Sequence, residues 1–180
     1  GHPDELVEVR MRGLGPSSFE TGTSWLNLVD WERTAISFTG FGAHRSQPFV
    51  GLGGCGTAME VRAWRMSAKA FDVLKVSPVL GRSFSADEDE ASGPRSVIIS
   101  DILWRNCFSR SETAVGRQMY IDGEPYTVVG VMPDTFEFPA LIGRDKPPLW
   151  LSLNLMAGQA ADRKARSLSI IARLRPGVTL

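Results

Sequence analysis

Apolar and polar residues alternate in several short stretches of the chain, and this alternation predicts β-strands. Leu6 to Met11 reads LVEVRM, the pattern of a strand with one buried face. Residues 57–66 would tolerate a helix or a strand, and we favour a strand because Met59, Val61 and Ala63 alternate with larger or polar neighbours. Three short apolar runs, SVIIS, LWLSL and SLSIIARL, predict further strands.

Residues 25–35 show the spacing of an amphipathic helix. Thr23 or Ser24 can cap its first turn. One face of this helix carries mostly apolar side chains at helical spacing, namely Trp25, Leu28, Val29, Glu32 and Ile36. We expect the apolar members of this face to pack on a sheet.

Two shorter helices are predicted downstream, each after a serine that can act as an N-cap. Ser67 precedes AKAFDVLKV, which Pro78 ends, and Ser100 precedes DILWRNCF. Asp101 lies in the first turn of the latter helix, where the helix dipole favours a negative charge. The buried side of that helix should consist of Leu103, Trp104, Cys107 and Phe108.

A hairpin is the firmest element that the sequence predicts. GRQMYI and EPYTVVGV flank Asp122-Gly123, the dipeptide that type I′ turns favour because both positions need a positive φ. We expect the helix from Asp101 to Phe108 to pack against this hairpin. Residues 36–56 are rich in glycine and strand-forming residues and predict strands or a hairpin that turns at the glycine cluster.

Composition and charge narrow the class of protein. The chain has 180 residues, 43% of them hydrophobic, and 20 basic residues balance 20 acidic ones. Without a basic excess, we expect no nucleic-acid partner. The apolar runs are far shorter than the roughly 20 residues that span a bilayer. The last residues, ARLRPGVTL, place Thr179 like the N-cap of a further helix, so we expect the chain to be excised from a longer protein. Whether that protein lies in a membrane stays open at this point.

Motifs with possible chemistry favour structural interpretations. Residues 51–56 match G-x-G-x-x-G, but a proline-broken segment precedes them, so we expect a turn rather than a dinucleotide site. Residues 87–90 are four consecutive acids, which do not alternate as calcium ligands do, so we expect a solvated loop. His2 is terminal and His44 is expected at the surface of a hairpin. We therefore assign no catalytic, cofactor-binding or metal-binding residue, and expect no cofactor.

Cys55 and Cys107 are the two cysteines of the chain. They are too few for a structural zinc site, and the histidines do not lie at ligand spacing with them. We favour two separate thiols, at least one of them buried, over a disulfide between the two cysteines.

Two surface patches remain open to more than one interpretation. Arg163, Lys164 and Arg166 form a basic patch that suits either a solvated loop or lipid headgroups. Phe136 and Phe138 lie in a proline-flanked loop before Pro139, and either cover the end of the core or present an apolar patch to a partner.

The order of these segments resembles a known family. The stretch MSAKAFDVLKVSPVLGRSFSADED, then SVIISDILWRNCF, VGRQMYIDGEPYTVVGVMPDTFEFP, LWLSL and IARLRPGVTL is similar to the MacB-like periplasmic core domain of MacB/FtsX-type ABC-transporter permeases. The resemblance covers nearly the whole chain and rests on order and spacing, because the individual motifs are not catalytic signatures.

The resemblance implies an α+β fold of two lobes. Residues 1–65 and 148–180 would form an α/β, porter-like lobe near the membrane, truncated at its C-terminal end. Residues 66–147 would form an inserted, mainly β, sabre-like lobe.

The resemblance also implies a location and a set of partners. The domain would lie on the periplasmic or extracytoplasmic face of the membrane, as a non-enzymatic relay of ATP-driven conformational change during export. Its partners would be the transmembrane helices of its own chain and a cytoplasmic ATPase. A periplasmic partner protein, an exported substrate and dimerisation of the full transporter are further expectations.

Two other classes of function stay open at the level of the sequence. One is a small-molecule-binding or hydrolytic enzyme whose site is assembled from dispersed carboxylates. The other is an adhesion or assembly module that does not belong to a transporter.

Overall fold

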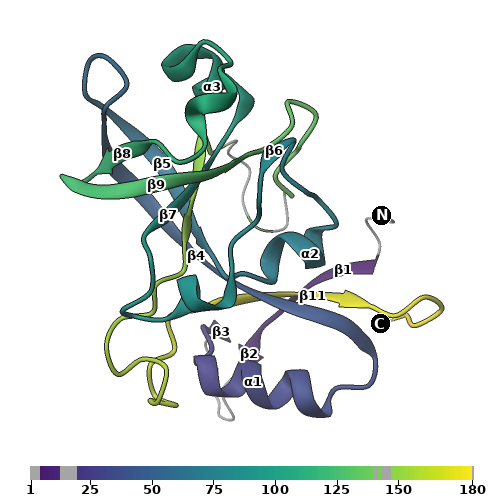
Figure 1. Cartoon of the computed structure of the whole chain (residues 1–180). Helices are drawn as coiled ribbons and strands as arrows, with labels where there is room; N and C mark the ends of the chain where they lie inside the picture. Colours follow the sequence, from purple (N-terminus) through teal and green to yellow (C-terminus); the bar gives the residue numbers. More distant parts are fainter. Residues whose placement is uncertain (1–4, 13–19, 140–141, 143–146, 180) are drawn as a thin grey trace.

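The computed structural model describes residues 5–12, 20–139, 142 and 147–179. Figure 1 shows one extended, strongly curved sheet with short helices packed around it. The α+β class predicted from the sequence is confirmed. The strands run over Leu6–Val9 (β1), Met11–Arg12 (β2), Glu20–Thr21 (β3), Phe38–Gly53 (β4), Met59–Met66 (β5), Leu80–Gly81 (β6), Ser96–Ile99 (β7), Gln118–Ile121 (β8), Glu124–Val131 (β9), Leu149–Ser152 (β10) and Ser169–Leu174 (β11).

The helices are short, and serine side chains start the two longest of them. Ser24 accepts a hydrogen bond from Asn27 N at 3.3 Å, and Ser100 accepts one from Leu103 N at 3.3 Å. Both caps are as predicted. The helical segments are Trp25–Thr34 (α1), Ala70–Leu74 (α2), Asp101–Phe108 (α3) and the 3₁₀ turns Ala86–Asp89 (η2) and Glu112–Ala114 (η3).

In the described part of the chain, nine strands form one sheet in the order β1-β11-β4-β5-β10-β7-β9-β6. The remaining strand, β8, pairs with both β4 and β9. This double pairing closes β4, β5, β10, β7, β9 and β8 into a ring of six strands, which we call the six-strand ring. Figure 1 shows β8 and β9 crossing over β4 and β5.

All six strands of the ring contribute to one interior core. Its largest fully buried members include Leu52, Ile99, Met119 and Leu151. The α3 helix covers one end of this core with Leu103, which is joined by the partly buried side chains of Trp104, Cys107 and Phe108. The helix and the β8–β9 hairpin therefore contribute to the same core, whereas a direct contact between them stays a prediction. We call this end the α3 end and the opposite end the basal end.

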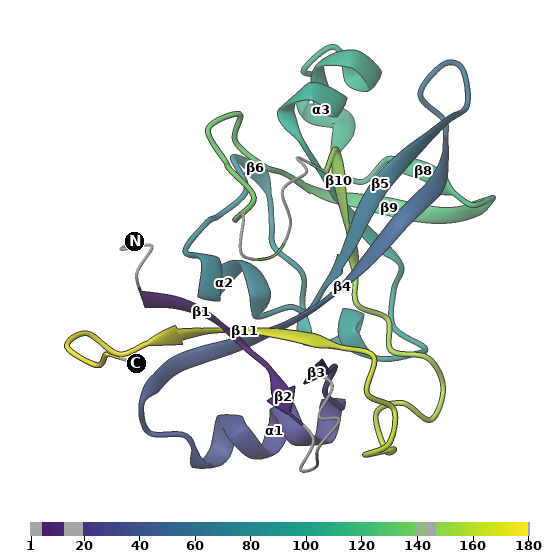
Figure 2. The ribbon, with the colours of Figure 1, turned by 180° about the vertical axis from the view of Figure 1, so that it is seen from behind.

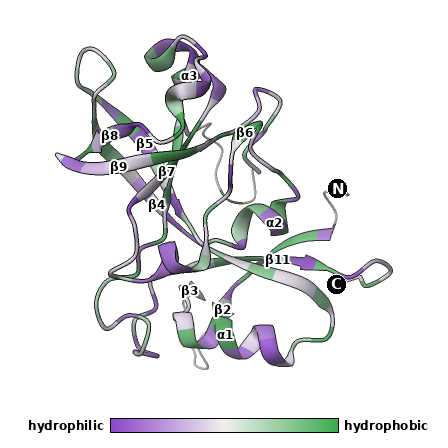
Figure 3. Ribbon diagram, in the orientation of Figure 1, coloured by the Kyte–Doolittle hydropathy of each residue, from purple (hydrophilic) through white to green (hydrophobic). Residues whose placement is uncertain are grey.

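The outer face of the ring and the adjoining sheet carry two further cores. The α2 helix covers one of them, which contains Phe71, Met132 and Trp150. The α1 helix covers the other, in which Leu28 packs near Phe41. Figure 2 shows α1 lying below β1 and β11, on the far side from α3. In Figure 3, α1 and α3 change between hydrophobic and hydrophilic residues along their length, as helices with one buried side do.

The long strand β4 joins these parts. Its first half pairs with β11, from Phe38 to His44, and its second half pairs with β5 and then with β8. The sequence predicted strands or a hairpin over residues 36–56. The structure has one 16-residue strand whose hairpin partner is β5, with the turn at the glycine cluster.

Two helix predictions need correction. Ser67 does not cap α2, because the helix begins at Ala70 and the Ser67 hydroxyl oxygen instead accepts a hydrogen bond from Ala43 N at 2.9 Å. Ile36 was placed on the buried face of α1, yet it is 84% exposed. The reason is that α1 ends at Thr34, so Ile36 no longer follows the helical period.

The Asp122-Gly123 hairpin forms as predicted. Asp122 has φ 53° and Gly123 has φ 82°, both in the left-handed region that a type I′ turn requires. The Asp122 carboxylate also accepts a hydrogen bond from Gly51 N at 2.7 Å, which ties the turn to β4. This contact helps to hold β8 in place as the closing strand of the ring.

Candidate functional site

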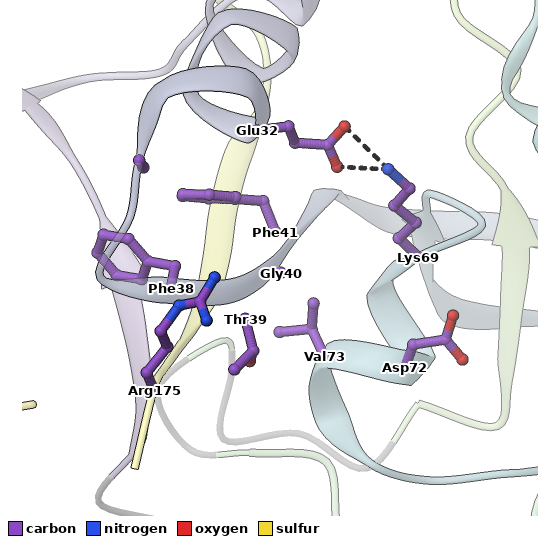
Figure 4. Close-up of a pocket in the computed structure, with 10 residues that line it drawn as sticks. Glu32, Phe38, Thr39, Gly40, Phe41, Lys69, Asp72, Val73 and Arg175 are labelled. Atoms are coloured by element: carbon purple, nitrogen blue, oxygen red, sulfur yellow. Dashed lines mark hydrogen bonds and ion pairs between the residues drawn. The ribbon is translucent and has the colours of Figure 1, made fainter. Parts of the chain in front are cut away.

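An open cavity of about 400 Å³ lies between α1, the first half of β4 and the start of α2. We call it the α1–α2 cavity; Figure 4 shows its lining. Its side chains come from three separate parts of the chain and combine an apolar floor with a charged rim. Phe38, Phe41 and Val73 supply most of the floor, and Glu32, Lys69, Asp72 and Arg175 supply the charges.

The sequence folds this way locally because α2 lies directly against β4. A Cβ atom at Gly42 would lie 2.6 Å from Ala70 Cα, so only glycine allows this close approach. Two residues earlier on β4, a Cβ atom at Gly40 would lie 3.5 Å from Val73 Cγ2 of α2. A contact of 3.5 Å is ordinary, so it is Gly42 that sets the distance between the strand and the helix.

An ion pair crosses the mouth of the α1–α2 cavity. Lys69 Nζ lies 2.9 Å from each carboxylate oxygen of Glu32, as the dashed lines in Figure 4 show. Lys69 is 63% exposed, so water screens the pair and its contribution to stability is about 1 kcal/mol or less. The pair can open at low cost and leave one charge of either sign for an incoming group.

The chemistry of the α1–α2 cavity suits contact with a polypeptide better than bond cleavage. An apolar side chain can rest on Phe38 and Phe41 while polar groups meet the rim. Glu32 and Asp72 are the carboxylates of the lining, and Glu32 is held by Lys69. Within residues 5–12, 20–139, 142 and 147–179, no group of three or more His, Cys, Asp or Glu side chains could hold a metal ion.

Glu32 is the residue of this cavity that the sequence pattern came closest to finding. It was predicted on the apolar face of α1, where a charged residue is unusual. The structure shows why it is tolerated there, because Lys69 from the segment before α2 neutralises it. The contributions of Lys69, Asp72 and Arg175 depend on how α2 and the end of β11 fold back, and no local pattern revealed them.

The acidic run at residues 87–90 is not the solvated loop that we expected. Glu88 is fully buried and Asp89 is 6% exposed. Arg82 binds both oxygens of Glu88 at 2.9 Å, and the Ser96 hydroxyl and Ser85 N donate to the same carboxylate. Burial alone would raise the pKa of Glu88, but these hydrogen bonds outweigh it and lower that pKa. The run turns inward because Glu88 forms a capping box with Ser85 at η2.

Asp89 behaves in the opposite way. Burial raises its pKa to about 7, although the carboxylate accepts hydrogen bonds from Ala68 N at 3.0 and 3.2 Å. Asp89 ties the start of the α2 segment to η2. It does not line the α1–α2 cavity, so we assign it a structural role.

His44 is also misplaced by the sequence prediction, since it is 2% exposed rather than at the surface. It lies where β4 pairs with β11 on one side and β5 on the other, and its ring packs 5.5 Å from that of Trp64. Neither ring nitrogen has a hydrogen-bond partner in the described part of the chain. Burial lowers the pKa of His44 to about 4, so the ring is neutral at pH 7.

The glycine motif at residues 51–56 is the end of β4 and the turn into β5, as predicted. Gly54 and Gly56 have φ values of 87° and 75°, which the turn requires. The strands around it are antiparallel, so the βαβ unit of a dinucleotide site is not formed here.

The cysteine prediction was wrong. Cys55 and Cys107 form a disulfide, with their Cα atoms 4.9 Å apart. Cys55 lies in the turn between β4 and β5, and Cys107 lies on α3, so the bond fastens the helix to the ring at the α3 end. The two residues are 52 positions apart, and only the folding of the hairpin over the helix brings them together.

The two surface patches have different outcomes. Phe136 and Phe138 pack with Trp150, at ring distances of 5.4 and 6.2 Å, and cover the core below α2 as in the first of the two interpretations. Arg163 contacts Asp30 at 2.7 Å and Asn27 at 3.0 Å, so part of the basic patch is neutralised by α1. A contact of this patch with lipid stays a prediction.

Within the described residues, no helix has both the length and the apolar character needed to cross a membrane.

Three solved structures share this fold. A domain described as part of a permease protein from Porphyromonas gingivalis aligns with a TM-score of 0.72 at 14% identity, over 98% of this chain and 75% of the other. The periplasmic region of MacB from Actinobacillus actinomycetemcomitans gives a TM-score of 0.68 at 14% identity, over 98% and 77%. The extracellular domain of the noncanonical ABC-type transporter YknZ from Gram-positive bacteria gives a TM-score of 0.62 at 13% identity, over 96% of this chain and 84% of the other.

No curated protein sequence matches the chain. The sequence does match a family model, described as the MacB-like periplasmic core domain, over residues 2–180. The match spans nearly every residue, in agreement with the resemblance seen in the order of its segments. The chain therefore belongs to the family of MacB-like periplasmic core domains.

Proposed function

We propose that the chain is the non-catalytic, extracytoplasmic domain of an ABC-transporter permease. In this role it relays ATP-driven conformational change and contacts an exported substrate or a partner protein. Membership of the family supports the location, as does the disulfide, because such bonds persist in oxidising compartments. Its partners are then the membrane helices of its own chain and a cytoplasmic ATPase, and the full transporter is a dimer.

The observation that carries the relay is the continuity of β4 and β5. The two strands pair from His44 and Met66 near α2 to Leu52 and Met59 near α3, on both sides of a bulge between Gln47 and Val50. This pairing links the two halves of the ladder in one sheet across the bulge, and the disulfide fixes its far turn to α3. A displacement applied near α1 would therefore move the α3 end as one body.

The proposed division into lobes follows the same axis. Residues 1–65 with 148–180 form the lobe nearer the membrane, and residues 66–147 form the inserted lobe. The lobes share one sheet, because β10 pairs with β5 on one side and β7 on the other. Leu6 pairs with Arg173, so the start of β1 and the end of β11 lie at one edge, where connections to membrane helices would suit.

The relay can be tested in the full-length permease with its ATPase in lipid. Spin labels at exposed Ile36 and Tyr120 would report on both ends of the domain. We expect the distance between these two labels to stay constant on ATP binding, while the distance from each to a label in the membrane part changes. Distances to the membrane that do not respond to nucleotide would contradict the proposal, and so would bending between the two labels.

A further inference from the structure

A second cavity, of about 590 Å³, opens at the basal end of the six-strand ring. We call it the basal cavity. It lies where the ring is not covered by a helix, and the mouths of β-barrels are a common place for ligand sites. Its lining is rich in arginine and hydroxyl groups. The residues that matter here are Arg45, Gln47, Arg65, Arg95, Glu124 and Tyr126.

Two arginines face each other across the floor of the basal cavity. Arg45 of β4 and Arg65 of β5 are direct partners in the antiparallel ladder, so their side chains leave the same face of the sheet. Side chains in such positions have Cβ atoms about 5 Å apart, and like charges there are destabilising. The same face carries the apolar core further along both strands, so an arginine pair there is not an ordinary solvated surface feature.

Arg65 is held rigidly by three neighbours that carry no charge. Its guanidinium donates to Gln47 Oε1 at 2.8 Å, to Ser152 O at 3.0 Å and to the Tyr126 hydroxyl oxygen at 2.9 Å. These bonds orient the group, but none of them neutralises it. The Tyr126 hydroxyl accepts here, and its own proton stays available for an acceptor placed in the cavity.

Arg45 has no hydrogen bond or ion pair with any residue in the described ranges. It is half-buried, and burial together with the charge of Arg65 lowers its pKa. An arginine still keeps its proton at neutral pH, because its ordinary pKa lies far above neutral. The cavity floor therefore holds two positive charges without a carboxylate on either.

The carboxylates of the basal cavity are occupied elsewhere. Glu124 pairs with Arg95 at the rim, where both side chains are exposed. Asp122 accepts a hydrogen bond from Gly51 N at 2.7 Å in the hairpin turn. Neither Glu124 nor Asp122 has a hydrogen bond or an ion pair with Arg45 or Arg65. The floor therefore stays positively charged and favours a negatively charged ligand between the two arginines.

We propose that the basal cavity binds an oxyanion, a carboxylate or phosphate group of a small molecule, between Arg45 and Arg65. The planar fork of Arg45 binds two oxygens of the anion, and the pre-oriented Arg65 and the Tyr126 hydroxyl complete the site. The anion relieves the repulsion between the arginines, which is why the pair persists in the folded chain. This site lies apart from the α1–α2 cavity and does not depend on the transport role.

The test is calorimetric titration of the 180-residue chain with inorganic phosphate and, separately, with succinate, at constant ionic strength. We expect saturable binding of at least one of them, with the tighter arm identifying phosphate or carboxylate as the source. Arg45→Gln should weaken that binding at least tenfold. The anion affinity of Arg45→Lys should lie between those of the parent chain and Arg45→Gln, because lysine keeps the charge and loses the two-pronged geometry.

Arg117→Gln is the matched control, since Arg117 is an exposed arginine outside the basal cavity. It should bind like the parent chain. Absence of saturable binding of both anions would overturn the proposal, and so would an Arg45→Gln variant that binds as tightly as the parent. Because Arg45 has no hydrogen bond or ion pair to lose among the described residues, the variant should fold, and its melting curve without anion checks this.

Discussion

The two ends of the six-strand ring differ in the bonds that their charged groups make. At the α3 end, the disulfide joins the β4–β5 turn to the helix, and Asp101 accepts hydrogen bonds from both Arg105 and Arg110. At the basal end, neither the Arg45 guanidinium nor the buried His44 ring beside it has a hydrogen-bond partner among the residues that the structure describes. Buried polar atoms without a partner among the described residues occur near both ends, at the His44 ring nitrogens and at Trp150 Nε1, which lies beside Asp101. The two ends differ in their charges, because the charge of Asp101 is paired and that of Arg45 is not.

With the proposed anion site, the difference lies between a structural end and a ligand-binding end. Burial alone would raise the pKa of Asp101, but the hydrogen bonds from Arg110 and Arg105 outweigh it and lower that pKa, as in a stabilising ion pair. Near the basal end, burial raises the pKa of Asp89 and lowers that of His44, so both are kept away from their charged forms. Polar groups held at such a cost are common at binding sites.

The disulfide should give the largest effect. Replacing Cys55 and Cys107 together by serine should lower the free energy of unfolding by about 4 kcal/mol, from the entropy of a closed loop of this length. The bond encloses 52 positions. Urea unfolding of the parent and the double variant measures the loss. An equal stability of the two would show that the α3 end does not depend on its covalent link.

His44 should make the basal end sensitive to acid. Between pH 6.5 and about 4 the unfolded chain binds a proton at His44 that the folded chain does not, so stability falls as pH falls through this window. The shift corresponds to about 3 kcal/mol. The difference in the free energy of unfolding between His44→Leu and the parent chain should therefore be larger at pH 4 than at pH 8, by about this amount. The urea midpoint at the two pH values checks this, and a gain that is the same at both would exclude a titrating His44.

Asp89 should work in the opposite direction. Its folded pKa of about 7 lies above the ordinary value, so the folded chain binds the extra proton and stability falls as pH rises from about 4 to 7. Asp89→Asn keeps the hydrogen bond from Ala68 N and removes the charge. We expect the free energy of unfolding to rise by a net amount of about 2 kcal/mol at pH 8, after subtracting the cost of the unpaired amide group that asparagine adds. At pH 4 we expect no gain.

The effects of His44 and Asp89 oppose each other between pH 4 and 7 in the parent chain. The two single variants should reveal slopes of opposite sign. If His44→Leu and Asp89→Asn showed the same slope, one of the two groups would not titrate in this window.

Local sequence patterns predicted most elements but not the tertiary placement of charges. The caps at Ser24 and Ser100 and the Asp122-Gly123 turn depend on neighbours within three residues, so they were found. The inward turn of Glu88 depends on Arg82 and Ser96. The disulfide depends on the β4–β5 turn meeting α3, 52 positions away in the sequence, and no local pattern encodes this meeting.

The arginine pair lies between the features that neighbouring residues encode and those that only the tertiary fold produces. An arginine in each strand of a hairpin, on the face that otherwise carries valine, leucine and alanine, is visible once the register is known. The sequence alone left residues 36–56 without a register, because Pro48 and the bulge between Gln47 and Val50 interrupt the alternation. Arg45 and Arg65 could therefore not be placed opposite each other in advance.

The sharpest comparison sets Asp101 against Arg45, and it has the smallest expected effect. Asp101→Asn should lower the free energy of unfolding by about 1 kcal/mol, because Asp101 is buried but its two arginines are about half exposed and regain water. Arg45→Gln should leave the stability unchanged or raise it slightly, since it removes a like-charge repulsion and no bond. Urea unfolding in low salt measures both. A loss at Arg45 as large as that at Asp101 would mean that Arg45 is paired as well as Asp101 is, and the charges at the two ends would no longer differ in kind.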